Sequence, residues 1–355
     1  MKDQGKIKLG ISIGDLNGIG PEIVLKTFSE AIMLDFCTPV IFASHKALSY
    51  IKKQLNSTLA FNGINKISDA VDGKVNVINS WTESFQFTVG EGTSKSGELA
   101  VKSFTQATAA LKAGEIDVLV TAPINKANIQ SEDFNFPGHT DYLAQELEGD
   151  AMMLMISDEL RVGLLTDHLP VKEVTSAITP DLIEKKVNTL YRTLRRDFAI
   201  DNPKIALLGI NPHLGDNGVI GDDDDKVVIP TLEKMRSSGK IVYGPYAADS
   251  FFGSGNYKNF DGIIAAYHDQ GLVPFKTLSF GQGVNYTAGL EAIRTSPDHG
   301  TAYEIAGKNQ ADIGSFRQAV YSAIEIYRNQ QEYDTLTQNI LKVSPRRAIG
   351  KSRIK

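Results

Sequence analysis

The sequence predicts an α/β fold in which helices cover a largely parallel sheet. Three observations support this prediction. Short β-branched or aliphatic runs alternate along the chain with stretches of helical periodicity. The runs are apolar without strict alternation, which is typical of strands buried on both faces. Most of them are followed at once by glycine, asparagine, aspartate or histidine, so polar residues gather at strand ends, where ligands bind in open α/β sheets.

The predicted strands lie at 7–13, 40–43, 75–78, 118–121, 205–210 and 263–267. Helical spacing of alanine, leucine and valine predicts a helix over 98–113, and a Thr-Pro-Asp start signal predicts another over 180–194. A last helix is predicted at about 315–327. We expect the basic tail, 342–355, to be a solvated or frayed terminus.

Composition favours a soluble globular protein of two joined domains. The chain has 355 residues, of which 42% are apolar and 22% charged, and a single core tends to stop growing at this length. We expect residues 1–135 plus 305–355 to form one subdomain and residues 136–304 to form the second. The net charge of -5 gives no electrostatic reason to expect nucleic acid or an anionic membrane as a partner.

Cysteine usage and hydropathy predict a cytoplasmic location. Cys37 is the single cysteine of the sequence, so an intramolecular disulfide is impossible and an oxidising compartment is not implied. The N-terminus lacks an apolar stretch of signal-peptide length, and the longest apolar cluster, 151–156, is too short to cross a bilayer.

Histidines at three strand ends predict a metal site. His168, His213 and His268 each follow an apolar strand, and neutral imidazoles suit Zn²⁺, Co²⁺ and similar ions. Each alone reads as an ordinary surface or hydrogen-bonded histidine; three equivalent placements weaken that interpretation. Nearby carboxylates, Asp167, Asp249 and Asp269, could orient the imidazoles or transfer protons.

A glycine-rich turn, 14–22, follows the first strand and leads into a helix. It fits neither the P-loop nor the dinucleotide-binding pattern, and no Rossmann fingerprint occurs elsewhere in the chain. A Rossmann dehydrogenase is therefore disfavoured. The turn itself has two interpretations that remain open here, a structural corner and a ligand-facing loop.

A second set of side chains suits a phosphate group. Thr140 lies at a predicted helix N-terminus, where backbone amides also point outward, and Arg294 can bind two phosphate oxygens at once. The other members are Lys126, His139, Lys276 and Asn285. Each alone could equally be a surface polar group or a cap. The acidic run 222–225 lacks the spacing of a calcium loop, and we expect it to stabilise the start of the following helix.

Six ordered motifs resemble the 4-hydroxythreonine-4-phosphate dehydrogenase family of vitamin B6 biosynthesis, over about residues 7–328. They are Gly14-Asp15 with Gly18-Ile19-Gly20-Pro21-Glu22, Phe136-Pro137-Gly138-His139-Thr140, Thr166-Asp167-His168-Leu169-Pro170, Asn211-Pro212-His213, Tyr267-His268-Asp269-Gln270-Gly271 and Arg294-Thr295-Ser296-Pro297-Asp298-His299-Gly300-Thr301-Ala302. The histidine-aspartate-glutamine-glycine and arginine-threonine-serine segments are the most specific.

The resemblance implies an isocitrate/isopropylmalate dehydrogenase-like fold, with two subdomains around a cleft, that works as a homodimer with sites at the subunit interface. It implies that His168, His213 and His268 bind one divalent ion, Zn, Mg or Co, with ligands shared between subunits. It also implies that His139, Thr140, Lys276, Asn285 and Arg294 contact the substrate. Enzymes of this fold bind NAD, or NADP, without the Rossmann fingerprint. The sequence assigns no residue to this cofactor.

The implied reaction is the NAD-dependent oxidation of 4-phosphohydroxy-L-threonine at C3, with decarboxylation to 3-amino-2-oxopropyl phosphate. Asp249, Asp269 and Lys276 are the candidates for proton transfer, and the sequence does not rank them. Departures from the family pattern, such as Leu16-Asn17 in the first turn, leave a branch that oxidises phosphorylated threonate or erythronate as an alternative. A zinc-dependent hydrolase and a non-catalytic sensor of a phosphorylated metabolite are the rival classes.

Overall fold

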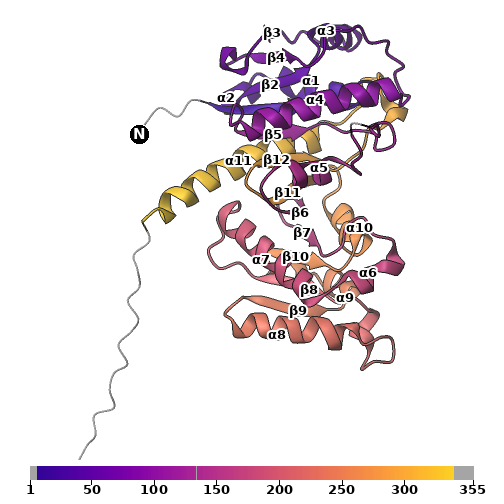
Figure 1. Cartoon of the computed structure of the whole chain (residues 1–355), viewed down its shortest axis with the longest axis vertical. Coiled ribbons are helices and arrows are strands. Elements are labelled where there is room, and N and C mark those ends of the chain that lie inside the picture. The colour runs from indigo at the N-terminus through magenta and orange to yellow at the C-terminus, as the bar shows by residue number, and fades with distance from the viewer. Residues whose placement is uncertain (1–5, 133, 340–355) are drawn as a thin grey trace, which may run out of the picture.

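A computed structural model describes residues 6–132 and 134–339, and its twelve strands form one sheet. Figure 1 shows the sheet running the length of the molecule between helices. The strand order is β3-β4-β2-β1-β5-β12-β11-β6-β7-β10-β8-β9. In chain order the strands are β1 (Ile7–Ser12), β2 (Cys37–Ala43), β3 (Phe61–Ile64), β4 (Val75–Asn79), β5 (Val118–Thr121), β6 (Gly149–Ile156), β7 (Arg161–Leu164), β8 (Ile205–Leu208), β9 (Val242–Tyr246), β10 (Gly262–Ala265), β11 (Val284–Leu290) and β12 (Ile293–Pro297).

The helices join these strands in the alternation that the sequence predicts. They are α1 (Gly20–Ser29), α2 (Met33–Phe36), α3 (His45–Gln54), α4 (Ser94–Lys112), α5 (His139–Glu146), α6 (Val171–Ala177), α7 (Pro180–Arg196), α8 (Ile229–Ser237), α9 (Ala248–Gly253), α10 (His268–Leu278) and α11 (Gly314–Thr337). None of the described helices is long and apolar enough to cross a membrane.

Two parallel halves meet at an antiparallel centre. One half contains β3, β4, β2, β1, β5 and β12, and the other contains β7, β10, β8 and β9. Between them β11 runs antiparallel to both β12 and β6, and β6 runs antiparallel to β7. The two halves therefore point in opposite directions, and the central strands pass between them.

Uniformly apolar runs form the buried strands. Every residue of β2, β5, β8 and β10 is buried, because helices and neighbouring elements cover both faces of these strands. The apolar cluster 151–156 belongs to β6.

The helix starts follow from local chemistry. Thr93 caps α4 through a capping box with Ser96, and Thr179 accepts a hydrogen bond from the backbone N–H of Leu182 at the start of α7. One face of α7 buries Ile183, Val187, Leu190 and Leu194. Truncating one such buried leucine to alanine costs about 2–5 kcal/mol of stability.

The predicted elements are confirmed with shifted ends. The predicted last helix, 315–327, is α11 and continues to Thr337. The division into subdomains 1–135 plus 305–355 and 136–304 stays a prediction, since one sheet runs through both parts. The basic tail, 342–355, lies outside the described residues.

Candidate active site

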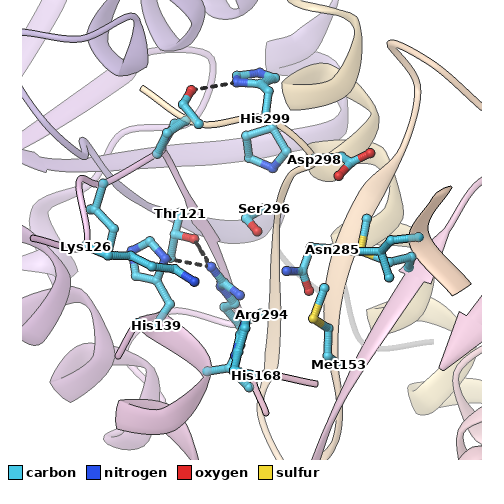
Figure 2. A pocket seen from close by; sticks show the side chains of 18 of the residues that line it. Thr121, Lys126, His139, Met153, His168, Asn285, Arg294, Ser296, Asp298 and His299 are labelled. Carbon is cyan, nitrogen blue, oxygen red and sulfur yellow. Dashed lines mark hydrogen bonds between the residues drawn. The ribbon is translucent and has the colours of Figure 1, made fainter. Parts of the chain in front are cut away.

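A cavity of about 310 Å³ lies over the central strands and is lined from both halves of the sheet. Figure 2 shows Arg294 and Asn285 on neighbouring strands at its wall. All five predicted substrate residues line this cavity: His139, Thr140, Lys276, Asn285 and Arg294. Two of the three predicted metal ligands, His168 and His268, line it as well. The structure thus brings together side chains that lie far apart in the sequence.

Arg294 is a buried cation in this wall. It lies on β12 and is 2% exposed. Its guanidinium donates hydrogen bonds to the hydroxyl oxygens of Thr121, at 2.6 and 3.0 Å, and Thr287, at 3.2 Å. No described carboxylate forms an ion pair with it, and burial lowers its pKa to about 9. A buried guanidinium of this kind is stabilised by an anion from solution.

His139 supplies a second donor beside Arg294. Arg294 Nη2 lies 2.9 Å from His139 Nδ1, and arginine can only donate. Nδ1 is therefore the acceptor and Nε2 carries the proton. Burial, Arg294 and Lys126 together hold the pKa of His139 well below its usual range, so the ring is neutral. Nε2 is buried without a partner among the described residues, which leaves its N–H for a ligand.

The first turn of α5 lies at the same wall. His139, Thr140 and Asp141 begin this helix and all three line the cavity, together with Lys126. Backbone N–H groups of a helix start have no partner within the helix and attract anions. This end of the cavity therefore offers one arginine, one lysine, one imidazole N–H and a helix N-terminus.

Lys276 is held at the opposite end by Asp298. Its Nζ lies 3.0 Å from Asp298 Oδ1 and donates to the Asp298 carbonyl oxygen at 3.3 Å. Burial raises the pKa of Asp298, and Lys276 partly offsets the rise. The backbone N–H of Asp298 donates to Ser315 Oγ, so the start of α11 fixes the segment that carries the carboxylate.

Asn285 reaches the cavity from β11. It pairs with Met155 of β6 and Ser296 of β12, and all three residues line the cavity. Its Oδ1 is buried without a partner among the described residues and can accept a hydrogen bond from a ligand.

Side-chain hydrogen bonds hold together the strand ends that carry the histidines. Thr166, at the end of β7, donates its hydroxyl hydrogen to the carbonyl oxygen of Ala266, after β10. Gln270 accepts from the N–H of Ala266 at 2.7 Å and donates to the Gly209 carbonyl oxygen, after β8, at 2.7 Å. These two residues explain the Thr-Asp-His and His-Asp-Gln-Gly segments in structural terms. Gly271 permits close packing, since a Cβ there would lie 3.0 Å from the Leu164 and Ala265 side chains and would force them to shift.

His168 and His268 face one another in the cavity of a single chain. Their ring centroids are 6.0 Å apart. Nδ1 of His268 lies 2.7 Å from Asp269 Oδ1, an arrangement that orients imidazoles in metal sites. Burial, with a smaller effect of Lys126, lowers the pKa of His168 and favours the neutral imidazole that binds metals.

His213 does not line the cavity of one chain. It lies exposed in the loop after β8, where His213, Leu214, Asp216 and Asn217 all have positive φ angles of 44–58°. Such backbone conformations cost energy and persist where the surrounding structure fixes them. Across the described ranges of one chain, no group of three or more histidine, cysteine or acidic side chains could hold a metal ion.

Two predicted proton-transfer residues also lie outside the cavity wall. Asp249 is exposed in α9, and Asp269 is exposed beside His268. Lys276 is the member of that group that lines the cavity. The sequence predicted no site role for Asp298 or Thr121. Asp298 lies in the motif that begins at Arg294, and Thr121 ends the predicted strand 118–121. Which residue will form a hydrogen bond or ion pair with a given lysine or arginine cannot be recognised from the sequence, because it depends on which segments become neighbours in the fold.

The glycine-rich turn is a structural corner. Asp15 is fully buried and accepts hydrogen bonds from the backbone N–H of Asn17 and the hydroxyls of Ser96 and Tyr303. The Asn17 side chain accepts from the N–H of Thr88 and donates to the carbonyl oxygen of Glu91. The turn is absent from the cavity wall, and its polar groups are used for packing adjacent loops.

The acidic run 222–225 lies at the start of a helix, as expected: Asp224 and Asp225 belong to the first turn of the π-helix Asp224–Val228, which leads into α8. Asp224 is fully buried, and its carboxylate accepts hydrogen bonds from the backbone N–H groups of Ile210 and Asn211 at 2.8 and 2.9 Å. It makes no capping hydrogen bond to the helix that follows. Asp224 therefore has an additional role, since it fixes the loop that carries His213.

Known proteins are similar to this chain in sequence and fold. The family model described as pyridoxal phosphate biosynthetic protein PdxA matches residues 35–323. The 4-hydroxythreonine-4-phosphate dehydrogenase of Bacteroides thetaiotaomicron is 46% identical, over 96% of this chain and 94% of that protein. The D-threonate 4-phosphate dehydrogenase of Cupriavidus necator is 34% identical, over 90% of this chain and 96% of its own length.

A solved structure supports the same assignment. The 4-hydroxythreonine-4-phosphate dehydrogenase from Klebsiella pneumoniae has a TM-score of 0.78 and 32% identity, with 92% of this chain and 99% of that chain covered. The predicted fold class is confirmed by this match. The chain belongs to the pyridoxal phosphate biosynthetic protein PdxA family.

Proposed function

We propose that this protein oxidises 4-phosphohydroxy-L-threonine at C3 with NAD and that the product loses CO₂ to give 3-amino-2-oxopropyl phosphate. The reaction belongs to pyridoxal 5'-phosphate synthesis, in agreement with the family description and the relative that is 46% identical. The observation that carries the proposal is the buried guanidinium of Arg294, which has no described carboxylate partner inside the cavity.

The phosphate group binds at Arg294, His139, Thr140 and Lys126 in this proposal. The Arg294 guanidinium lies beside the ring of His139. The Nε2–H group of His139 has no partner among the described residues and is a second hydrogen-bond donor. Together with Lys126 and the first turn of α5, they match a phosphate dianion in charge and in hydrogen-bond donors. The rest of the substrate then extends toward Asn285, Lys276 and the histidines.

The residues present fit a divalent metal ion. His168 and His268 would supply two imidazoles in one chain, and Asp269 would orient the second. A bound Zn²⁺, Mg²⁺ or Co²⁺ lowers the pKa of a coordinated hydroxyl and stabilises negative charge on a carbonyl oxygen. NAD, or NADP, is the hydride acceptor. His213 is the third proposed ligand, and it does not reach the cavity of its own chain here.

Lys276 is the proposed proton-transfer group within the cavity. Oxidation releases the hydroxyl proton of the substrate, and decarboxylation requires a proton at the carbon that carried the carboxylate. Asp298 contacts the Lys276 amine at 3.0 Å and favours this orientation of a flexible side chain. Asp249 and Asp269 remain proposed proton carriers for a site completed by a partner.

We also propose a homodimer with shared sites. Exposed apolar residues follow each predicted metal ligand within six positions: Val171 after His168, Val219 after His213 and Val273 after His268. Their side chains are 76%, 81% and 61% exposed. Apolar residues that remain exposed beside a site favour burial against another chain. A second copy seated there would meet the loop that carries His213.

A second substrate deserves a direct comparison, because relatives named D-threonate 4-phosphate dehydrogenase are 34% identical. The two substrates differ at C2, where one carries an amino group and the other a hydroxyl. The higher identity to the first relative favours the amino acid substrate.

The deciding experiment measures NADH formation by the purified protein with each substrate, with and without added divalent metal. We expect the higher kcat/KM with 4-phosphohydroxy-L-threonine, and loss of activity after treatment with a chelator. NADH formation with 4-phospho-D-threonate alone would transfer the assignment to that branch. Substrate hydrolysis without NADH formation would indicate the hydrolase class.

A further inference from the structure

A second cavity, of about 460 Å³, lies on α7 at the far end of the β11–β12 hairpin. It is lined by Arg192, Arg195 and Arg196 of α7, by Lys240 before β9, by Glu291 of the hairpin, and by Tyr191 and Tyr333. We call it the arginine–tyrosine pocket. None of its lining residues lines the active-site cavity.

Four cations surround this pocket, and carboxylates neutralise one of them. Arg196 lies 3.1 Å from Asp334 and 3.4 Å from Glu291. Asp197 is buried and accepts hydrogen bonds from Tyr286 and Gln330, at 2.8 and 2.7 Å. Among the described residues, no carboxylate forms an ion pair with Arg192, Arg195 or Lys240.

Aromatic rings hold two of the unpaired cations in place. The Arg195 guanidinium carbon lies 5.9 Å from the ring centroids of both Tyr191 and Tyr333. Lys240 Nζ lies 4.5 Å from the Tyr191 ring centroid. These distances are in the range of cation–π attraction, which positions the charges without neutralising them.

Unused polar atoms also lie at the pocket. Arg195 Nε and Thr189 Oγ1 are buried without a hydrogen-bond partner among the described residues. Thr189 itself is 1% exposed. Buried polar atoms of this kind normally have a hydrogen-bond partner, and both residues line the pocket.

We propose that the arginine–tyrosine pocket binds the phosphate group of a small molecule, at a site separate from the active-site cavity. Three unpaired cations provide more positive charge and more hydrogen-bond donors than a ligand with a single carboxylate can use. A phosphate dianion, which has two negative charges and several acceptor oxygens, matches them better. The ligand is either inorganic phosphate or a phosphate monoester. The inference does not rest on the proposed reaction.

Equilibrium dialysis of the full-length protein tests this, with radiolabelled inorganic phosphate as the probe. We expect two equivalents per chain, one at each cavity. Arg195→Gln combined with Lys240→Gln should remove one equivalent and leave turnover unchanged, because neither residue lines the active-site cavity. The matched control removes two exposed lysines elsewhere, Lys66→Gln with Lys74→Gln, and should keep both equivalents.

A single equivalent in the unaltered protein that disappears in Arg294→Gln would overturn the proposal. Two equivalents retained in Arg195→Gln with Lys240→Gln would overturn it as well. If that double variant does not fold, Lys240→Glu alone should weaken the second equivalent about tenfold, and unchanged binding would contradict the proposal. Repeating the dialysis in competition with phenyl phosphate identifies the source. If phenyl phosphate competes more strongly than unlabelled phosphate does, the ligand is a phosphate monoester. If it competes more weakly, the ligand is inorganic phosphate.

Discussion

Arg294 donates a hydrogen bond to His139, with Nη2 2.9 Å from Nδ1, and this contact fixes the protonation of both side chains. A guanidinium cannot accept, so the imidazole must be neutral with its proton on Nε2. Both side chains then present N–H donors to the same cavity, as phosphate binding requires.

The neutral state of His139 predicts a loss of stability in acid. Its pKa is held well below the ordinary value of 6.5, so below that pH the unfolded chain binds a proton that the folded chain does not. Stability should therefore fall as pH decreases through about 6.5 toward the folded pKa. Urea unfolding at about pH 7.5 and about pH 5.5 measures the fall. His139→Gln should show a smaller fall, and an equal fall in both proteins would contradict this origin.

Replacing Arg294 by lysine should weaken substrate binding although the charge remains. A lysine cannot form the paired hydrogen bonds to Thr121 and Thr287 while also reaching a ligand. We expect KM for the phosphorylated substrate to rise about 10- to 100-fold, corresponding to one or two charge-assisted hydrogen bonds. Steady-state kinetics measure this, and a melting temperature close to that of the unaltered protein verifies folding. Unchanged KM and kcat would remove Arg294 from the phosphate site.

Asp298→Asn should lower turnover without lowering stability. The substitution removes the charge that holds Lys276 at 3.0 Å. Burial already raises the pKa of Asp298, so loss of the carboxylate carries little cost to the fold. We expect kcat to fall at least about tenfold, with a smaller change in KM. Asp158→Asn, at an exposed carboxylate, is the control. Equal kinetics in both variants would show that Lys276 needs no such partner.

Mixing two inactive variants tests the shared metal site. His168→Ala and His213→Ala should each abolish activity. If His213 comes from the partner subunit, half of randomly mixed dimers are heterodimers with one intact site, which restores roughly one quarter of full activity. No restoration, with subunit exchange verified, would show that each chain holds its metal alone. His168 with His268 is an unsuitable pair, since these residues meet within one chain.

Asp224→Ala should destabilise the protein by about 3 kcal/mol, because two backbone N–H groups lose a charged acceptor. Both belong to Ile210 and Asn211, in the loop that leads to His213. Asp225→Ala, at the exposed neighbouring carboxylate, should leave stability unchanged. Urea unfolding of the two variants provides the measurement, and similar unfolding midpoints would contradict the assigned role.

The strands that the sequence predicts are largely apolar runs, whether or not they contribute to the site: Thr121, at the end of β5, lines the cavity. The strand predicted at 118–121 has the same bounds as β5, because its residues are all apolar or buried and neighbouring elements cover both faces. In contrast β12 reads Ile-Arg-Thr-Ser-Pro and β11 carries Asn285, and neither was predicted. Their polar residues build the cavity wall and interrupt the apolar run that identifies a buried strand. The polar residues that these two strands contribute to the cavity therefore prevent their recognition as strands from the sequence.

The same division applies to the site. Motifs identified the residues that face the cavity, such as His139, Lys276 and Arg294. They did not identify Thr121 or Asp298, because a supporting hydrogen bond depends on which strands become neighbours. The extension of α11 beyond residue 327 was missed for a similar reason. Its last turns are polar, and Gln330 is buried by its hydrogen bond to Asp197.

The place of β12 in the sheet affects how the chain folds during synthesis. Arg294 and Thr121 touch across β12 and β5, yet they are 173 residues apart in the chain. At the usual rates of translation, roughly 10–35 s pass between the synthesis of β5 and the synthesis of β12. During that interval one edge of β5 offers unpaired backbone groups to any other strand, including one on another nascent chain. A nascent chain of this protein is therefore most prone to aggregate before residue 297 has left the ribosome, and the cavity wall that carries Arg294 is among the last parts to form.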